Sequence, residues 1–153
     1  MNPFSGPRVP RGAVALFGAL LLTLTVACGD DPVGPQVLEG TYQLVQVNGQ
    51  DLPAQMLEQE TQSGEVWAIY VTAGSLTLKE AQSHSSVTVS ELWIDGELDD
   101  EAEFSVDGSY SVSGDSITLV EGNHVLRGTF SGNRIEVSAV EPGFGLVTWT
   151  YEG

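Results

Sequence analysis

The sequence contains a single cysteine, Cys28, and only two histidines, His84 and His124. One cysteine excludes an intramolecular disulfide, because a disulfide needs a partner thiol. Positive charge is also scarce, with five Lys and Arg against 21 Asp and Glu and a formal net charge of −16. A chain this acidic repels phosphate backbones, so we expect no nucleic-acid partner. It equally disfavours anionic lipid head groups, so electrostatics would not hold the protein to a membrane.

The longest apolar run, residues 13–27, is too short to cross a bilayer comfortably, which takes about 20 residues. A segment with two arginines and no acid precedes the run, and the polar residues 29–32 follow it. This order of basic, apolar and polar parts is typical of a secretory signal peptide. We therefore predict a signal peptide over residues 1–27, with the small residue Ala27 at its end, and a mature chain that begins at Cys28.

Leu24-Thr25-Val26-Ala27-Cys28 resembles the lipobox of bacterial lipoproteins. The resemblance implies cleavage before Cys28, a diacylglycerol on its sulfur and an acyl chain such as palmitate on its new amino group. Two or three chains anchor a protein durably, whereas one chain binds reversibly. In Gram-negative envelopes an aspartate after this cysteine favours the inner membrane. Gly29 stands there, so we expect an outer-membrane lipoprotein, with an ordinary signal peptide and a coincidental cysteine as the alternative.

Residues 28–39 are rich in proline and glycine, a composition that keeps a chain extended, and we predict that they form a flexible tether. Residues 40–153 then form one domain, since this length suits one hydrophobic core.

Apolar and polar residues alternate along this domain with the period of two that indicates strands buried on one face. The pattern covers residues 41–47, 65–81, 86–95, 104–112, 117–119, 126–130, 135–139 and 147–151. A change of parity between Val71 and Leu76 predicts a bulge at residues 73–75. Residues 52–63 are less regular, and we expect a short helix that starts at Pro53, or a loop.

Short turns separate most of these strands. Residues 112–117 and 130–135 repeat the pattern apolar-Ser-Gly-[Asp/Asn]-x-Ile, and glycine beside Asp or Asn supplies the positive φ of tight hairpins. With no long helical pattern, the fold class is all-β. We predict an antiparallel up-and-down meander that closes into a small barrel of seven or eight strands, because closure removes exposed edges.

Gly40-Thr41-Tyr42-Gln43-Leu44, with Val47-Asn48-Gly49 and Leu52-Pro53, resembles the opening of bacterial lipocalin-like, calycin-type lipoproteins. Residues 71–78 and 108–114 continue the resemblance, which covers most of the mature chain. It implies a lipocalin-like barrel that binds a small hydrophobic molecule, and it implies no known substrate. The Val-Asn-Gly opening is also similar to META-type envelope domains, which stand as an alternative fold.

Aromatic side chains at strand spacing are the candidates for lining an apolar pocket. They are Tyr42, Trp67, Trp93, Phe104, Tyr110, Phe130, Trp149 and Tyr151. Such residues also form packed cores, so two hypotheses stay open. A cavity would suit a ligand-binding protein, and a filled barrel would suit a structural or assembly-assisting envelope protein with a protein partner.

Catalysis has little support in the sequence. A nucleophile needs a base beside it, and the spacing brings no serine and acid to either histidine. We expect His84 and His124 to lie on solvated turns, and we predict no catalytic residue and no enzyme.

The most acidic stretch, residues 95–103, places Asp95, Glu97 and Asp99 at alternate positions, as calcium loops do. Asp100 then stands where an EF-hand requires glycine. We therefore expect a solvated hairpin loop, with no metal site and no cofactor.

Overall fold

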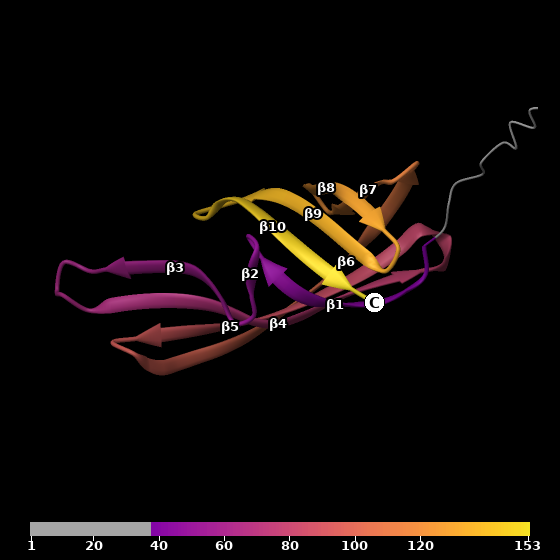
Figure 1. Ribbon diagram of the computed structural model, residues 1–153. Coiled ribbons are helices and arrows are strands. Elements are labelled where there is room, and N and C mark those ends of the chain that lie inside the picture. Colours follow the sequence, from indigo (N-terminus) through magenta and orange to yellow (C-terminus); the bar gives the residue numbers. More distant parts are fainter. Residues whose placement is uncertain (1–37) are drawn as a thin grey trace, which may run out of the picture. The chain divides into compact units, whose positions relative to one another are not determined.

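The computed structural model describes residues 38–153, so the predicted signal peptide, Cys28 and most of the predicted tether lie outside the described residues. Strands dominate this part of the chain (Figure 1). They are β1 (Gly40–Val47), β2 (Gln50–Asp51), β3 (Ala54–Glu60), β4 (Val66–Lys79), β5 (Ser83–Ile94), β6 (Glu97–Ser113), β7 (Ser116–Glu121), β8 (His124–Ser131), β9 (Arg134–Glu141) and β10 (Gly145–Glu152). A 3-10 turn, Glu80–Gln82, joins β4 to β5.

Eight of the strands close into an antiparallel up-and-down barrel. Consecutive strands from β4 to β10 pair in chain order, and β10 pairs with β1. The ring closes where Gly40, at the start of β1, lies opposite Leu78 of β4. The predicted all-β class and the predicted barrel are therefore confirmed, and the architecture is compatible with a lipocalin-like fold. The short strands β2 and β3 lie outside the ring.

Two-residue turns connect β6 to β7, β7 to β8 and β8 to β9. Each turn begins with a glycine in the left-handed region, with φ of 61° at Gly114, 63° at Gly122 and 61° at Gly132. An Asp or Asn follows each glycine. This is the hairpin chemistry that the repeated Ser-Gly-[Asp/Asn] pattern predicted.

Strands β4, β5 and β6 are 14, 12 and 17 residues long, longer than the strands from β7 to β10. The excess length of β4 pairs with β3 on one side and with β5 on the other, and that of β6 pairs with β5. Figure 1 shows β3, β4, β5 and β6 reaching past the ends of β9 and β10. We call residues 54–60, 66–71, 90–94 and 97–102 the extension. Its inner face is the one that continues the barrel interior, and its outer face is the other.

The expectation of a helix or loop over residues 52–63 is wrong, because residues 54–60 form strand β3. The register of β3 against β4 shifts between Gln55 and Leu57, and this irregularity hides the period of two. The bulge expected at residues 73–75 lies slightly earlier, where the register of β4 against β5 shifts between Val71 and Ala73.

The acidic loop expected over residues 95–103 is also wrong. The turn contains only Asp95 and Gly96, with φ of 53° and 82°, as a tight Asp-Gly hairpin requires. The remaining acidic residues belong to β6. Residues 97–107 of β6 pair with β5 alone, so the acidic side chains lie on a free sheet edge, where charge discourages pairing with other chains.

The hydrophobic core runs through the barrel interior from the end at which β1 begins to Val47, the last residue of β1. Its largest fully buried apolar side chains are Leu76, Leu78, Ile117, Leu119, Ile135, Val47, Val137 and Val147. Leu38 packs against this core, and its carbonyl accepts a hydrogen bond from the Tyr110 hydroxyl. Within residues 38–153 no helix is long and apolar enough to cross a membrane.

Candidate functional site

The opposite end of the barrel, which we call the mouth, contains a cavity of about 410 Å³. The turns after β7 and β9 and the extension surround it. Ten side chains supply its apolar lining. They are Met56, Ile69, Val71, Phe104, Val106, Leu119, Leu126, Phe144, Trp149 and Tyr151.

Strand β5 gives the cavity one polar wall. Its inward positions in this region are Ser86, Thr88 and Ser90, which lie opposite Leu76, Gly74 and Val71 of β4. The valines between them, Val87 and Val89, have the opposite parity and point outward. The inward face of β5 is therefore lined with hydroxyl groups, which can hydrogen-bond to a ligand.

A buried polar cluster lies on the same side of the interior. Glu121 Oε1 accepts hydrogen bonds from His84 Nε2 at 3.1 Å and from Ser86 Oγ at 3.0 Å. His84 is 1% exposed, and its Nδ1 has no hydrogen-bond partner among the described residues. Gly108 makes room for the ring, because a Cβ at that position would lie 2.5 Å from His84 Cε1.

These hydrogen bonds set the charge of the cluster. The hydrogen bond from His84 is the main cause that lowers the pKa of Glu121. The hydrogen bond from Ser86 also lowers this pKa, whereas burial raises it. Glu121 is therefore a carboxylate at neutral pH. Burial, together with the Glu121 charge, raises the pKa of Tyr151, which stays a neutral phenol.

A second histidine and glutamate pair lies nearer the rim. His124 Nε2 is 3.5 Å from Glu141 Oε1, and their side chains are 36% and 25% exposed. The Nε2 atom is buried and makes no hydrogen bond within the described part of the chain, so the two groups are close without a hydrogen bond. Both residues line the cavity.

The expectation that His84 lies on a solvated turn is wrong. The strand that contains it begins at Ser83, three residues earlier than its apolar pattern indicates, so His84 takes an inward position opposite Leu78 and Gly108. His124 is half-buried at the first position of β8. Gly108 is the sequence feature that could have indicated the buried position of His84, because a glycine among the inward apolar residues of a strand often marks a place where another group packs closely against the backbone.

The cluster lacks the geometry of a serine hydrolase. His84 Nε2 and Ser86 Oγ both bond to the same Glu121 oxygen, whereas a nucleophile must bond to its base. Among residues 38–153, no three His, Cys, Asp or Glu side chains are grouped so that they could hold a metal ion.

An apolar tract continues from the cavity along the inner face of the extension. Ile69, Ser90, Phe104 and Phe144 belong both to the cavity and to an adjoining hollow of about 280 Å³. Ile69 and Leu92 connect that hollow to a further one of about 210 Å³, which Leu57 and Trp67 also line. We call these two hollows the apolar tract.

The structure divides the eight predicted aromatic residues into three groups. Phe104, Trp149 and Tyr151 line the cavity, and Trp67 lines the hollow of the apolar tract that is farther from the cavity. Three others pack in or against the core instead, namely Tyr42, Tyr110 and Phe130.

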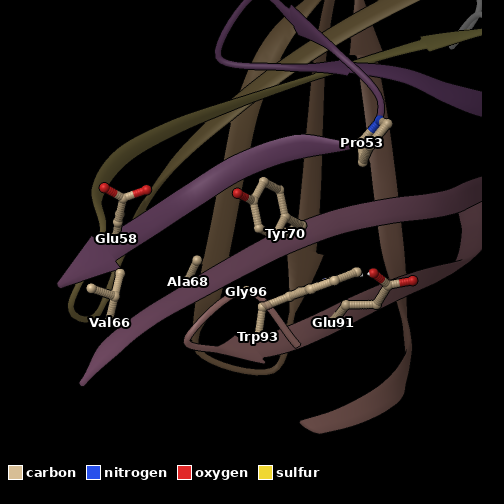
Figure 2. Close-up of a pocket in the computed structure, with 8 residues that line it drawn as sticks. All are labelled: Pro53, Glu58, Val66, Ala68, Tyr70, Glu91, Trp93 and Gly96. Carbon is tan, nitrogen blue, oxygen red and sulfur yellow. Dashed lines mark hydrogen bonds between the residues drawn. The ribbon is translucent and has the colours of Figure 1, made fainter. Parts of the chain in front are cut away.

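Trp93, the last of the eight, lies on the outer face of the extension. There it lines a hollow of about 460 Å³, which Figure 2 shows. Its ring meets that of Tyr70 edge to face at 6.4 Å, and its Nε1 donates a hydrogen bond of 2.8 Å to Glu91. This hollow lies on the face opposite to the cavity, because Trp93 pairs with Ala68 while Leu92 pairs with Ile69.

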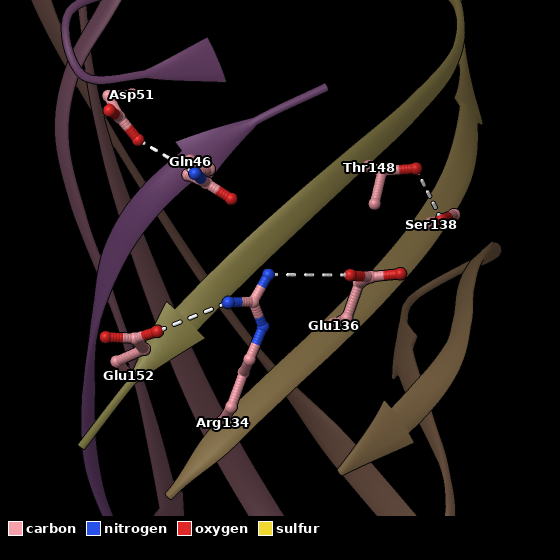
Figure 3. A network of polar contacts seen from close by, with 7 residues as sticks. All are labelled: Gln46, Asp51, Arg134, Glu136, Ser138, Thr148 and Glu152. Atoms are coloured by element: carbon pink, nitrogen blue, oxygen red, sulfur yellow. Dashed lines mark hydrogen bonds and ion pairs between the residues drawn. The ribbon is translucent and has the colours of Figure 1, made fainter. Parts of the chain in front are cut away.

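The exterior of the barrel carries the positive charges of the described residues. Arg134 lies between Glu152, at 3.4 Å, and Glu136, at 3.9 Å, on the outer surface of β9 and β10 (Figure 3). Lys79 and Arg127 are also exposed. In residues 38–153, therefore, the cavity is lined by carboxylates without a lysine or arginine.

No known protein family matches the sequence, and comparisons with curated proteins and with solved structures find no significant match.

Proposed function

We propose that this protein is a membrane-anchored, non-enzymatic binding protein of the bacterial envelope, whose barrel holds a small hydrophobic ligand. The observation that carries the proposal is the cavity at the mouth. Its volume of about 410 Å³ lies within the range of about 300–1,000 Å³ that is usual for small-molecule sites. Its apolar walls with a few convergent polar groups have the composition of such sites.

Attachment to the membrane is the second part of the proposal. It is supported by the lipobox-like segment that ends at Cys28, the single cysteine of the chain. Lipid on Cys28 would anchor a domain whose strong negative charge gives no attraction to anionic bilayers. Gly29 after the cysteine favours the outer membrane.

A structural or assembly-assisting role with a protein partner is the second candidate. One observation favours it, namely two exposed apolar residues that lie opposite each other on the β9–β10 hairpin. Val140 is 71% exposed and Leu146 is 68% exposed. Exposed apolar patches of this kind mark interaction surfaces when they are extensive.

A cavity-filling variant tests the ligand-binding proposal. Ser90 lines the cavity, so Ser90→Trp places an indole inside it, whereas Ser105→Trp adds the same side chain at an exposed position on β6. The full chain in phosphatidylcholine nanodiscs would be titrated with N-phenylnaphthylamine, a neutral apolar fluorophore, and empty nanodiscs would supply the blank. We expect Ser90→Trp to weaken binding roughly tenfold or more and Ser105→Trp to leave it unchanged. Equal binding by both variants, or no binding by the parent chain, would contradict the proposal.

A further inference from the structure

We infer that the ligand is a cationic amphiphile, with an amine head group at the carboxylates of the cavity and an apolar tail along the apolar tract. This inference rests on the proposed ligand-binding function and adds the chemical class of the ligand. Three features of the described residues carry it: the carboxylates inside the cavity, the placement of the cations, and the continuity between the cavity and the apolar tract.

Two carboxylates, Glu121 and Glu141, line a cavity with mainly apolar walls. The Glu121 side chain is 12% exposed, so it lies deep, and the Glu141 side chain is 25% exposed, nearer the rim. Glu121 is held in its charged form by the bonds from His84 and Ser86. A charge in so apolar a setting interacts more strongly with an opposite charge than it would in bulk water.

The cations of the domain do not reach these carboxylates. Lys79, Arg127 and Arg134 are all exposed, and the last is paired with glutamates on the outer surface (Figure 3). His84 and His124 are the basic groups near the cavity, and protonation of both would only balance the two carboxylates. While both carboxylates are charged, the cavity is therefore not net positive, so it offers no net attraction to an anionic head group such as a fatty-acid carboxylate.

An ammonium group suits the polar groups on this side of the cavity. It carries donors only, as the amine of lysine does, and the carboxylates accept such donors. Ser86, Thr88 and Ser90 on the wall of β5 can accept further hydrogen bonds through their hydroxyl oxygens. Charge-assisted hydrogen bonds of this kind are about twice as strong as those between neutral groups.

The apolar tract provides a place for the tail. Phe104 is 57% exposed, Trp67 is 42% exposed and Phe144 is 40% exposed, although all three line the cavity or the tract. An alkyl chain that leaves the cavity past Ile69 and Phe104 would cover these side chains. The burial of this apolar surface would supply the main part of the binding free energy.

Three probes of equal chain length separate head-group selection from hydrophobic binding. They are octylamine, 1-octanol and octanoate, which are cationic, neutral and anionic at neutral pH. The full chain would be held in phosphatidylcholine nanodiscs, with empty nanodiscs as the blank, and binding would be followed by tryptophan fluorescence, since Trp149 lines the cavity. We expect octylamine to bind roughly tenfold tighter than octanol, and octanoate to bind weakest.

Charge-neutral variants identify the partner of the head group. Glu141→Gln leaves the buried His84 cluster intact and should weaken octylamine roughly tenfold without changing octanol. Glu121→Gln should have the same effect. Glu103→Gln removes the same charge from the free edge of β6, where Glu103 is exposed and faces outward opposite Val89, and should change nothing.

The outcomes separate the two proposals. Equal binding of the three probes, or tightest binding of octanoate, would overturn the cationic head group and leave the ligand-binding function standing. Binding of none of the probes would overturn both. An amine preference that persists in Glu141→Gln and Glu121→Gln, or that is lost equally in Glu103→Gln, would show that the net charge of the chain, and not the cavity, selects the amine.

Discussion

His84 Nε2 and Glu121 Oε1 lie 3.1 Å apart inside the barrel and join residues that are 37 positions apart in the chain. Strand β5 supplies the imidazole and the last residue of β7 supplies the carboxylate, and β6 lies between these two strands in the sheet. The contact is possible because the strand between them has no side chain at Gly108. A buried polar pair is thus built into the wall of the proposed binding cavity.

Glu121 should make the stability of the domain depend on acid pH. Its pKa lies below the ordinary value of 4.5, chiefly because of the bond from His84, and His124 and Tyr151 also face it. A lowered pKa stabilises the folded state above the ordinary value, and this contribution is lost as the pH falls through the folded pKa. We expect Glu121→Gln to lower the free energy of unfolding at neutral pH by about 1–3 kcal/mol and to flatten its decline in acid.

Urea unfolding across the acid range checks this expectation. Glu136→Gln is the control, because Glu136 is exposed on the outer surface and its contact with Arg134 at 3.9 Å should contribute little. An unchanged pH dependence in Glu121→Gln would remove Glu121 as its source.

Gly108→Ala should destabilise the barrel. The added methyl group would meet the Val120 carbonyl and lie 2.5 Å from His84 Cε1, so either the backbone or the imidazole must move. Such overpacking lowers the free energy of unfolding by about 1–3 kcal/mol. Thermal or urea unfolding measures the effect, and Ser109→Ala, at an exposed neighbouring position, should stay within about 0.5 kcal/mol of the parent chain. Equal stability of the two variants would mean that the interior tolerates a side chain at position 108.

The acidic edge of β6 should keep the protein from associating through its sheet. Glu101→Thr with Glu103→Thr removes two charges where β6 pairs on one side only, and it introduces residues that favour strands. We expect association that rises with protein concentration, measured by light scattering after size-exclusion chromatography. The pair Glu65→Thr and Asp115→Thr removes the same charge from exposed positions outside the strands, and it should leave the chain dispersed. If neither double variant associates, the charge on the edge of β6 is not what prevents association.

Cys28→Ala should abolish attachment to the membrane. Without the thiol no diacylglycerol can be added, and the remaining chain is strongly acidic. Metabolic labelling with palmitate and membrane fractionation measure the two consequences. Cys28→Ser also lacks the thiol, but its hydroxyl group is closer in polarity to a thiol than the methyl group of alanine is. It should behave in the same way as Cys28→Ala. Labelling that persists in both variants would place the lipid elsewhere or exclude it.

The barrel was predictable from the sequence because its signals are local. The hairpins after β6, β7 and β8 are marked by Gly114, Gly122 and Gly132, and the strands around them alternate cleanly. Strand β3 was not predicted, because the shift of its register between Gln55 and Leu57 hides the period of two. Residues 97–103 were not predicted as part of a strand, because a run of acidic residues has the composition of a loop.

The site was less predictable, because it depends on which strands become neighbours. Glu121 has the parity of Ile117 and Leu119, but it ends its strand beside a turn, where a glutamate is usually solvated. Its contact with His84 requires the pairings of β5 with β6 and of β6 with β7. The hydroxyl residues of β5 occupy its inward face although Val87 and Val89 are more apolar, because the pairing of β5 with β4 sets which face of the strand points inward.

Native mass spectrometry of the full chain, purified under mild conditions from the cells that produce it, tests the central claim most directly. The cavity of about 410 Å³ should retain a small molecule, and the apolar tract should slow its release. We expect a second mass of definite value that disappears in Ser90→Trp and persists in Ser105→Trp. A protein without any non-covalently bound small molecule, in the parent chain and in both variants, would contradict the claim that the barrel binds a ligand.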